Sequence, residues 1–188
     1  VIDVVEGRHA AAVTDWLQLQ DPAWRAQVAT VALDPYAGYR TAVTDRHVGF
    51  PSAQLVADCF HVVKLANAAI DDVRRRVQQE TLGHRGHKRD PLYRIRRTLL
   101  AGIERLDSDA LVRIRTALAA GDPYDEVGCA WTAKELVRAV FATRDPDLAA
   151  RQLVAFYDWV ALVEVPELVR LATTLSRWQA EILAYHHT

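Results

Sequence analysis

The 188-residue sequence contains no methionine, only two cysteines and no long apolar segment. Because the chain shows no secretion signal, we expect Cys59 and Cys129 to be reduced thiols and not a disulfide. No stretch approaches the roughly 20 apolar residues that a membrane helix requires, and the first residues do not resemble a signal peptide. These absences predict a cytoplasmic protein without a membrane span.

Hydrophobic residues make up 51% of the sequence and charged residues 25%, so the chain can bury a substantial core in one or two domains. The net charge of -1 hides a local excess of positive charge between residues 74 and 97. Arginine binds phosphate oxygens in pairs, so this segment predicts contact with nucleic acid, although a solvated helix face is the alternative. Its basic residues are Arg74, Arg75, Arg76, Arg85, Lys88, Arg89, Arg94, Arg96 and Arg97.

The residue pattern predicts a short α/β start followed by a long helical region. We expect strands at residues 1–5, 30–33 and 54–57, with helices at 9–20 and about 34–45 between them. The next helices are predicted, from caps and breakers, at residues 60–80, 92–106, 108–120, 125–143, 146–163 and 167–186. A three-strand sheet leaves exposed edges, so the sequence looks like a fragment of a larger fold.

Acidic residues follow the second and third predicted strands. Asp34 ends one strand, and Asp58 ends the next with His61 three residues later. Acids at successive strand ends can face one crevice and suit a divalent metal. The alternative is structural: Asp34 can cap a helix that starts at Pro35, and Asp58 can cap the following helix, with His61 as a satisfied, partly buried histidine.

Two blocks of the sequence resemble the DDE-type transposases of bacterial insertion sequences, most closely the ISL-three group and more distantly the Mutator type. The first block comprises Asp34, Tyr36, Tyr39, Phe50, Pro51, Ala53 and residues 56–67. The second comprises residues 83–86 and 90–97. The resemblance runs through the whole chain and weakens after Arg97.

This resemblance implies a ribonuclease-H-like catalytic core at residues 1–61, holding part of the sheet, and an all-helical insertion domain at 62–188. It makes Asp34 the second acid of the catalytic triad and a metal ligand. Asp58 remains an alternative ligand, and His61 could orient an acid or touch DNA. The first catalytic Asp would precede residue 1 and the final Glu would follow residue 188, so the chain alone should be inactive.

The implied activity is DNA strand cleavage and transfer during transposition, with two Mg²⁺ ions held by three carboxylates. The implied partners are the terminal repeats of the insertion sequence and further copies of the protein in a homo-oligomer. Contact with DNA is expected from Arg74, Arg75, Arg85, Lys88, Arg89, Arg94, Arg96 and Arg97.

Other interpretations compete with this one. The chain could be a non-catalytic helical module for DNA binding or oligomerisation that retains a degenerate α/β start. A zinc site is not expected, because no Cys-x-x-Cys or His-x-x-x-His pair stands in a supporting context among Cys59, His61, His84, His87 and Cys129. Glu181 is expected to be a surface residue, since no Asn-Gly turn precedes it.

Overall fold

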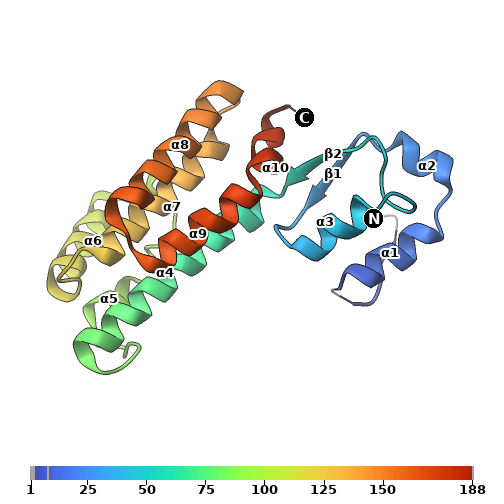
Figure 1. Ribbon diagram of the computed structural model, residues 1–188. Helices are drawn as coiled ribbons and strands as arrows, with labels where there is room; N and C mark the ends of the chain where they lie inside the picture. Colours follow the sequence, from blue (N-terminus) through green and yellow to red (C-terminus); the bar gives the residue numbers. More distant parts are fainter. Residues whose placement is uncertain (1–2, 8, 188) are drawn as a thin grey trace. The chain divides into compact units, whose positions relative to one another are not determined.

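The computed structural model describes residues 3–7 and 9–187 (Figure 1). It divides into two compact units. The first unit is Val1–His61 with Trp178–Thr188, and the second is Val62–Arg177. Segments from both ends of the chain therefore share the first unit. Whether the two units correspond to a catalytic core and an insertion domain stays a prediction.

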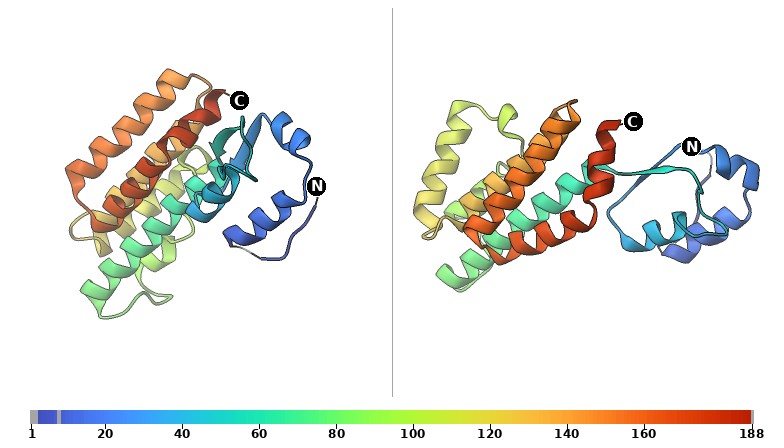
Figure 2. Two further views of the ribbon diagram at one scale, coloured as in Figure 1. Left: turned by 45° about the vertical axis from the view of Figure 1, so that its right-hand side comes forward. Right: turned by 45° about the horizontal axis from the view of Figure 1, so that its top comes forward.

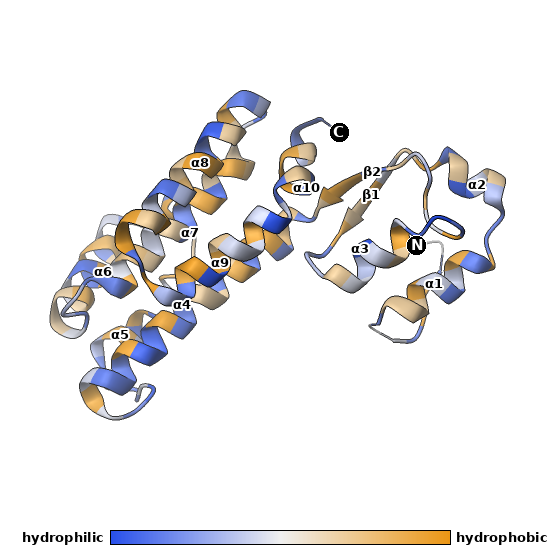
Figure 3. Ribbon diagram, viewed as in Figure 1, coloured by the Kyte–Doolittle hydropathy of each residue, from blue (hydrophilic) through white to orange (hydrophobic). Residues whose placement is uncertain are grey.

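A parallel pair of strands forms the sheet of the first unit. Strand β1 (Thr30–Leu33) pairs with β2 (Gln54–Ala57), and Leu33 lies opposite Ala57 in the register. Both strands are apolar, as Figure 3 shows. The strand expected at residues 1–5 is wrong for Asp3–Val5, whose valines are exposed and unpaired, and residues 1 and 2 lie outside the described part. The described residues thus form two strands, not three.

Short helices surround this strand pair. Helix α1 packs against α3, and α10 packs against β2. One helix, α2, was not expected: Asp21 accepts the amide of Ala23 and Pro22 takes the first helical position, so this Asp-Pro pair starts a helix as well as ending the previous one. The bounds are α1 Ala10–Gln18, α2 Pro22–Gln27, α3 Ala37–Val43, α10 Gln179–Ala184 and the 3₁₀ turn η2 Tyr185–His187.

The second unit is all-helical over its described residues, and most of its helices agree with the sequence prediction. Helices α7 and α8 lie side by side in Figures 1 and 2, and α9 packs on α8. The buried core includes Phe156 of α8 and Val137 of α7. The bounds are α4 Cys59–Leu82, which starts in the first unit, α5 Pro91–Ile95, η1 Ile103–Arg105, α6 Ser108–Gly121, α7 Glu126–Ala142, α8 Pro146–Val163 and α9 Pro166–Arg177.

Two of the expected helices are interrupted. The helix predicted at 92–106 ends at Ile95, and beyond it the buried Lys134 binds the carbonyl oxygens of Leu99 at 2.8 Å and Ala101 at 2.5 Å. The helix predicted at 167–186 breaks at Trp178, which is buried and leaves helical geometry at φ -111° and ψ 10°. A buried side chain lies at each interruption.

Within the described part of the chain, no helix combines the length and the apolar character needed to span a membrane.

Candidate functional site

Parallel pairing of the strands brings Asp34 and Asp58 together. Each acid directly follows a strand, and the last residues of the strands, Leu33 and Ala57, are register partners. The amide of Asp58 extends the ladder by donating to the carbonyl of Leu33 at 2.8 Å. Carboxyl ends of parallel strands share one edge of the sheet, as the strand pattern in the sequence predicted.

The imidazole of His61 lies between the two carboxylates. Its Nδ1 is 2.9 Å from Oδ1 of Asp34 and 3.0 Å from Oδ2 of Asp58. Helix α4 begins at Cys59, so His61 lies on its first turn and faces back toward the strand ends. The structure therefore unites the three residues that the sequence indicated as candidates.

The two acids differ in their local role. Asp58 caps α4 by accepting the amide of Phe60 at 2.9 Å, so the structural interpretation of Asp58 is correct and coexists with its contact to His61. Asp34 does not cap a helix: α3 starts at Ala37, and its N-cap, Tyr36, has no side-chain capping bond. The carboxylate of Asp34 is thus left for contacts outside the backbone.

Access and donor chemistry decide what this cluster can hold. The side chains of Asp34, Asp58 and His61 are 45%, 38% and 31% exposed, so a small ion or a phosphate can reach them. Their potential ligand atoms lie within 4.8 Å of one another. Two carboxylates suit Mg²⁺, which prefers oxygen ligands, whereas an imidazole nitrogen is a less usual partner for that ion.

An ion pair between a partly exposed arginine and a buried glutamate joins α3 to the C-terminal segment. Glu181 of α10 is buried, not a surface residue as expected, and it accepts hydrogen bonds from Arg40 of α3, one of them at 2.7 Å. The Arg40 guanidinium also lies over the Trp178 ring, 4.6 Å from its centroid. Glu181 was misjudged because its partner lies 141 positions away in the sequence.

The same C-terminal segment approaches the start of α4. Negative charge on the Cys59 sulfur and a hydrogen bond with it raise the pKa of the Tyr185 hydroxyl, and the nearby charge of Asp58 adds to the effect. Tyr185 therefore lies near Cys59 and Asp58. No local pattern in the sequence indicated this neighbour.

In the basic segment, residues 74–97, some cationic side chains contact neighbouring residues and others are exposed. Arg74 is 3% exposed and bonded to Asp71 and Gln78, so it is removed from any surface. Arg75 approaches Asp71 and Asp72, and Arg96 lies over the Tyr93 ring at 4.0 Å. The remaining predicted residues are exposed and form no ion pair with a described carboxylate: Arg85, Lys88, Arg89, Arg94 and Arg97.

A groove in the second unit adds an arginine that was not predicted from the sequence. Arg113 of α6 lines it together with Arg89 and Arg94, around an apolar floor that includes Ile95 and Ala117. The three guanidinium groups come from separate segments, the loop before α5, α5 itself and α6. Helical spacing within α6 does not indicate that Arg113 joins the others.

Comparison with family models matches residues 1–188 to a transposase family, the ISL-three group of DDE transposases. Comparison with curated proteins and with solved structures gave no match. The family match spans both units and includes the strand ends, the basic segment and the C-terminal segment. It confirms the resemblance inferred from the two sequence blocks, and the chain therefore belongs to the ISL-three family of DDE transposases.

Proposed function

We propose that the chain supplies part of the catalytic site for metal-dependent DNA strand cleavage and transfer during transposition of an insertion sequence. The observation that carries the proposal is the meeting of Asp34 and Asp58 at one sheet edge, both within 3.0 Å of His61 Nδ1. The parallel strands β1 and β2 would then be the central part of a ribonuclease-H-like sheet.

Asp34 is the metal ligand in this proposal, and Asp58 is the second candidate. Their carboxylate oxygens fit Mg²⁺, which would activate the attacking oxygen and stabilise the leaving one when bound. Asp34 has the stronger claim, because its carboxylate has no structural role in capping. A DDE site uses three carboxylates, so this cluster would contribute to the site without completing it.

His61 acts as a positioning residue. Its Nδ1 can donate a hydrogen bond to either carboxylate, which limits the rotation of both side chains. Ligand side chains held by hydrogen bonds keep their geometry when the ion arrives, so less ordering remains to be done on binding. Phe60, exposed beside the His61 ring at 5.2 Å between centroids, restricts the ring in turn.

In this proposal, the exposed arginines of the second unit bind DNA. Arg89, Arg94 and Arg113 line one groove, and none of them pairs with a carboxylate of the described residues. Uncompensated guanidinium groups can bind phosphates in pairs of hydrogen bonds and release counterions from the DNA. Arg74 is left out of this surface because it is buried. Assembly as a homo-oligomer stays a prediction.

Substitution of Asp34 tests the catalytic part. In the intact transposase with Mg²⁺, Asp34→Asn should lower cleavage of terminal-repeat DNA by at least about 1000-fold, since it removes charge stabilisation of several kcal/mol and each 1.36 kcal/mol is a factor of ten. Binding of the same DNA should stay within a few fold. Asp15→Asn, on the exposed face of α1, is the matched control and should cleave normally.

A parallel Asp58→Asn variant decides between the two acids. Loss of cleavage in Asp34→Asn alone would assign the ligand to Asp34, and loss in Asp58→Asn alone would transfer the assignment. If both variants cleave normally while the protein still binds DNA, the catalytic proposal is wrong, and the alternative of a non-catalytic DNA-binding module gains its support.

A further inference from the structure

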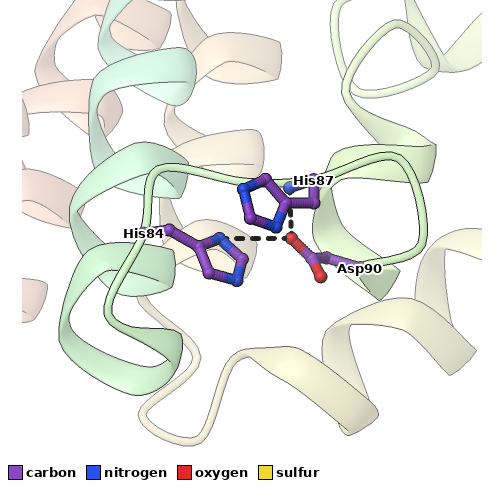
Figure 4. Close-up of side chains that lie close together, drawn as sticks. All are labelled: His84, His87 and Asp90. Atoms are coloured by element: carbon purple, nitrogen blue, oxygen red, sulfur yellow. Dashed lines mark hydrogen bonds and ion pairs between the residues drawn. The ribbon is translucent and has the colours of Figure 1, made fainter.

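A second cluster of metal-ligating groups lies far along the chain from the first, in the loop between α4 and α5. His84, His87 and Asp90 come together there, with their ligand atoms within 4.8 Å of one another (Figure 4). The loop bends sharply, because Gly86 adopts φ +119° and passes so close to Gln78 that an added Cβ would lie 2.7 Å from its Oε1. Glycine at this position lets the loop close on itself.

The polar contacts in this loop bring two potential ligand atoms close together. Nδ1 of His84 accepts the amide hydrogen of Gly86 at 3.2 Å. The same Nδ1 lies 3.6 Å from Oδ2 of Asp90. Both atoms can offer a lone pair to a metal ion once Nδ1 releases the amide of Gly86.

One distance in the cluster is close to that between two ligands of a bound transition metal. Ligand bonds of about 2.0–2.1 Å in a tetrahedron place the ligand atoms roughly 3.4 Å apart. His84 Nδ1 and Asp90 Oδ2 already lie 3.6 Å apart, and the His87 ring stacks on the His84 ring with 3.8 Å between centroids. Because the two rings are nearly parallel, at 14°, one imidazole must turn before both ring nitrogens can point at one ion and complete a three-ligand set.

Buried side chains hold the carboxylate behind this set. Nε2 of Gln78 donates to Oδ2 of Asp90 at 3.2 Å, and the backbone amide of His87 donates to the same oxygen. Oε1 of Gln78 in turn accepts from Arg74 at 2.6 Å, and both of these side chains are almost fully buried. Metal ligands in proteins are commonly oriented by such outer hydrogen bonds.

We propose that His84, His87 and Asp90 bind a zinc ion, with a fourth position open to water. Two imidazoles and one carboxylate suit Zn²⁺, whereas Mg²⁺ prefers an all-oxygen set. The expectation that the histidines lack zinc-like spacing considered only histidine and cysteine, and it overlooked the carboxylate of Asp90. The sequence spacing is His-x-x-His-x-x-Asp.

The ion would fix the loop that carries Arg85, Lys88 and Arg89. These side chains are exposed and belong to the proposed DNA surface, so this consequence rests on the proposed function, whereas the zinc site does not. An ordered loop presents its cations without paying the entropy of ordering when DNA binds.

Zinc titration of the chain tests the site directly. Competition with a chromogenic chelator should show one bound zinc ion per chain. In His84→Gln and in His87→Gln, the affinity for zinc should fall by more than roughly 100-fold. Loss of a residue that only hydrogen-bonds to a ligand should lower it by roughly 10- to 100-fold. Gln78→Leu should show that smaller loss. His47→Gln, an exposed histidine of the first unit, is the matched control and should bind like the unsubstituted protein.

Cobalt substitution gives a second readout that does not depend on affinity. Co²⁺ bound by two imidazoles and a carboxylate in a tetrahedron should give visible absorption bands that vanish in His87→Gln. Zinc binding that is equal in the His84 and His87 variants and in the unsubstituted protein would overturn the proposal, and so would a chain that takes up no zinc at micromolar concentrations.

The Asp34→Asn variant separates this inference from the proposed function. It should keep the zinc equivalent while losing cleavage, because Asp34 belongs to the other cluster. Loss of the equivalent in Asp34→Asn, with retention in His87→Gln, would place the zinc at the strand ends instead and would also overturn the proposal.

Discussion

Two pairs of acidic residues, one in each unit, are used differently. In the first unit, Asp34 and Asp58 meet a histidine at the strand ends, and no arginine or lysine of the described residues lies within ion-pair distance of them. In the second unit, Glu126 and Glu167 bind the guanidinium of Arg76. An acid that already has a cation partner holds helices together, whereas an exposed acid without one can still take a metal ion. Whether an acid has a cationic partner therefore indicates a candidate metal site better than the presence of the acid alone.

Substitution of Arg76 tests whether acids that are paired with a cation hold the helices together. It reaches from α4 to Glu126 of α7 and Glu167 of α9, and these two hydrogen-bonded carboxylates raise its pKa well above the usual range. Arg76→Met leaves the buried Glu167 without its partner, and we expect a decrease of about 3 kcal/mol in the free energy of unfolding. Urea unfolding combined with hydrogen exchange should place the decrease in the second unit.

Arg75→Met is the control for that experiment. Arg75 is half exposed and lies 3.7 Å or more from its acidic neighbours, so its removal should cost less than about 1 kcal/mol. Equal effects of the two substitutions would contradict the view that the Arg76 pairs hold the helices together.

Substitution of Lys134 should have the next largest effect. Here the buried charge in the second unit is a cation and not a carboxylate. Its ammonium group binds two backbone carbonyls and Glu135, and burial lowers its pKa. Lys134→Met leaves the carbonyls of Leu99 and Ala101 without donors, and we expect about 2–3 kcal/mol of destabilisation in urea unfolding. Lys64→Met, at an exposed position of α4, should change little.

The first unit also contains an acid that is paired with an arginine, Glu181 with Arg40. Arg40→Met removes the partner of the buried Glu181, and the expected destabilisation is about 2 kcal/mol, less than for Arg76 because Arg40 is itself partly exposed. Hydrogen exchange should rise in α3, β2 and α10. Arg46→Met, on an exposed turn, is the control, and an unchanged exchange rate in α10 would show that the ion pair does not hold this helix to the sheet.

The weakest effect should be seen in DNA affinity. Substitution of Arg94 and Arg113 together by Ala should lower the slope of log affinity against log salt by about 0.9 for each phosphate that is no longer neutralised. Arg115→Ala is the matched control, because Arg115 is exposed on α6 but does not line the groove. A slope that falls equally in both variants would mean that the groove has no special part in phosphate binding.

The sequence predicted the elements whose signals are local. Breakers and caps indicated α8 with its bounds and α6 and α7 within one or two residues, and β-branched runs indicated β1 and β2. The prediction failed after Ile95, where Lys134 binds carbonyls of the expected helix from a remote position, and at Trp178, which leaves helical geometry. Local propensity cannot register hydrogen bonds made by residues more than 30 positions away.

For the candidate site too, the sequence indicated the residues with local signals and missed those whose partners are remote. Asp34, Asp58 and His61 were found from the sequence because each follows a strand or lies on the next helical turn, and a parallel register then necessarily brings the strand ends together. Glu181 and Arg113 were missed, since their partners come from other elements. Asp90 was missed as a ligand candidate because the expected zinc spacing considered only histidine and cysteine.

The order of residues alone therefore specifies where the strands end, where most helices start and stop, and which family the chain resembles. Which charges are engaged in ion pairs and which remain accessible follows only from the three-dimensional packing. The physical reason is that pairing and burial depend on distances between segments remote in sequence, whereas capping, periodicity and strand ends depend on neighbours within a few residues.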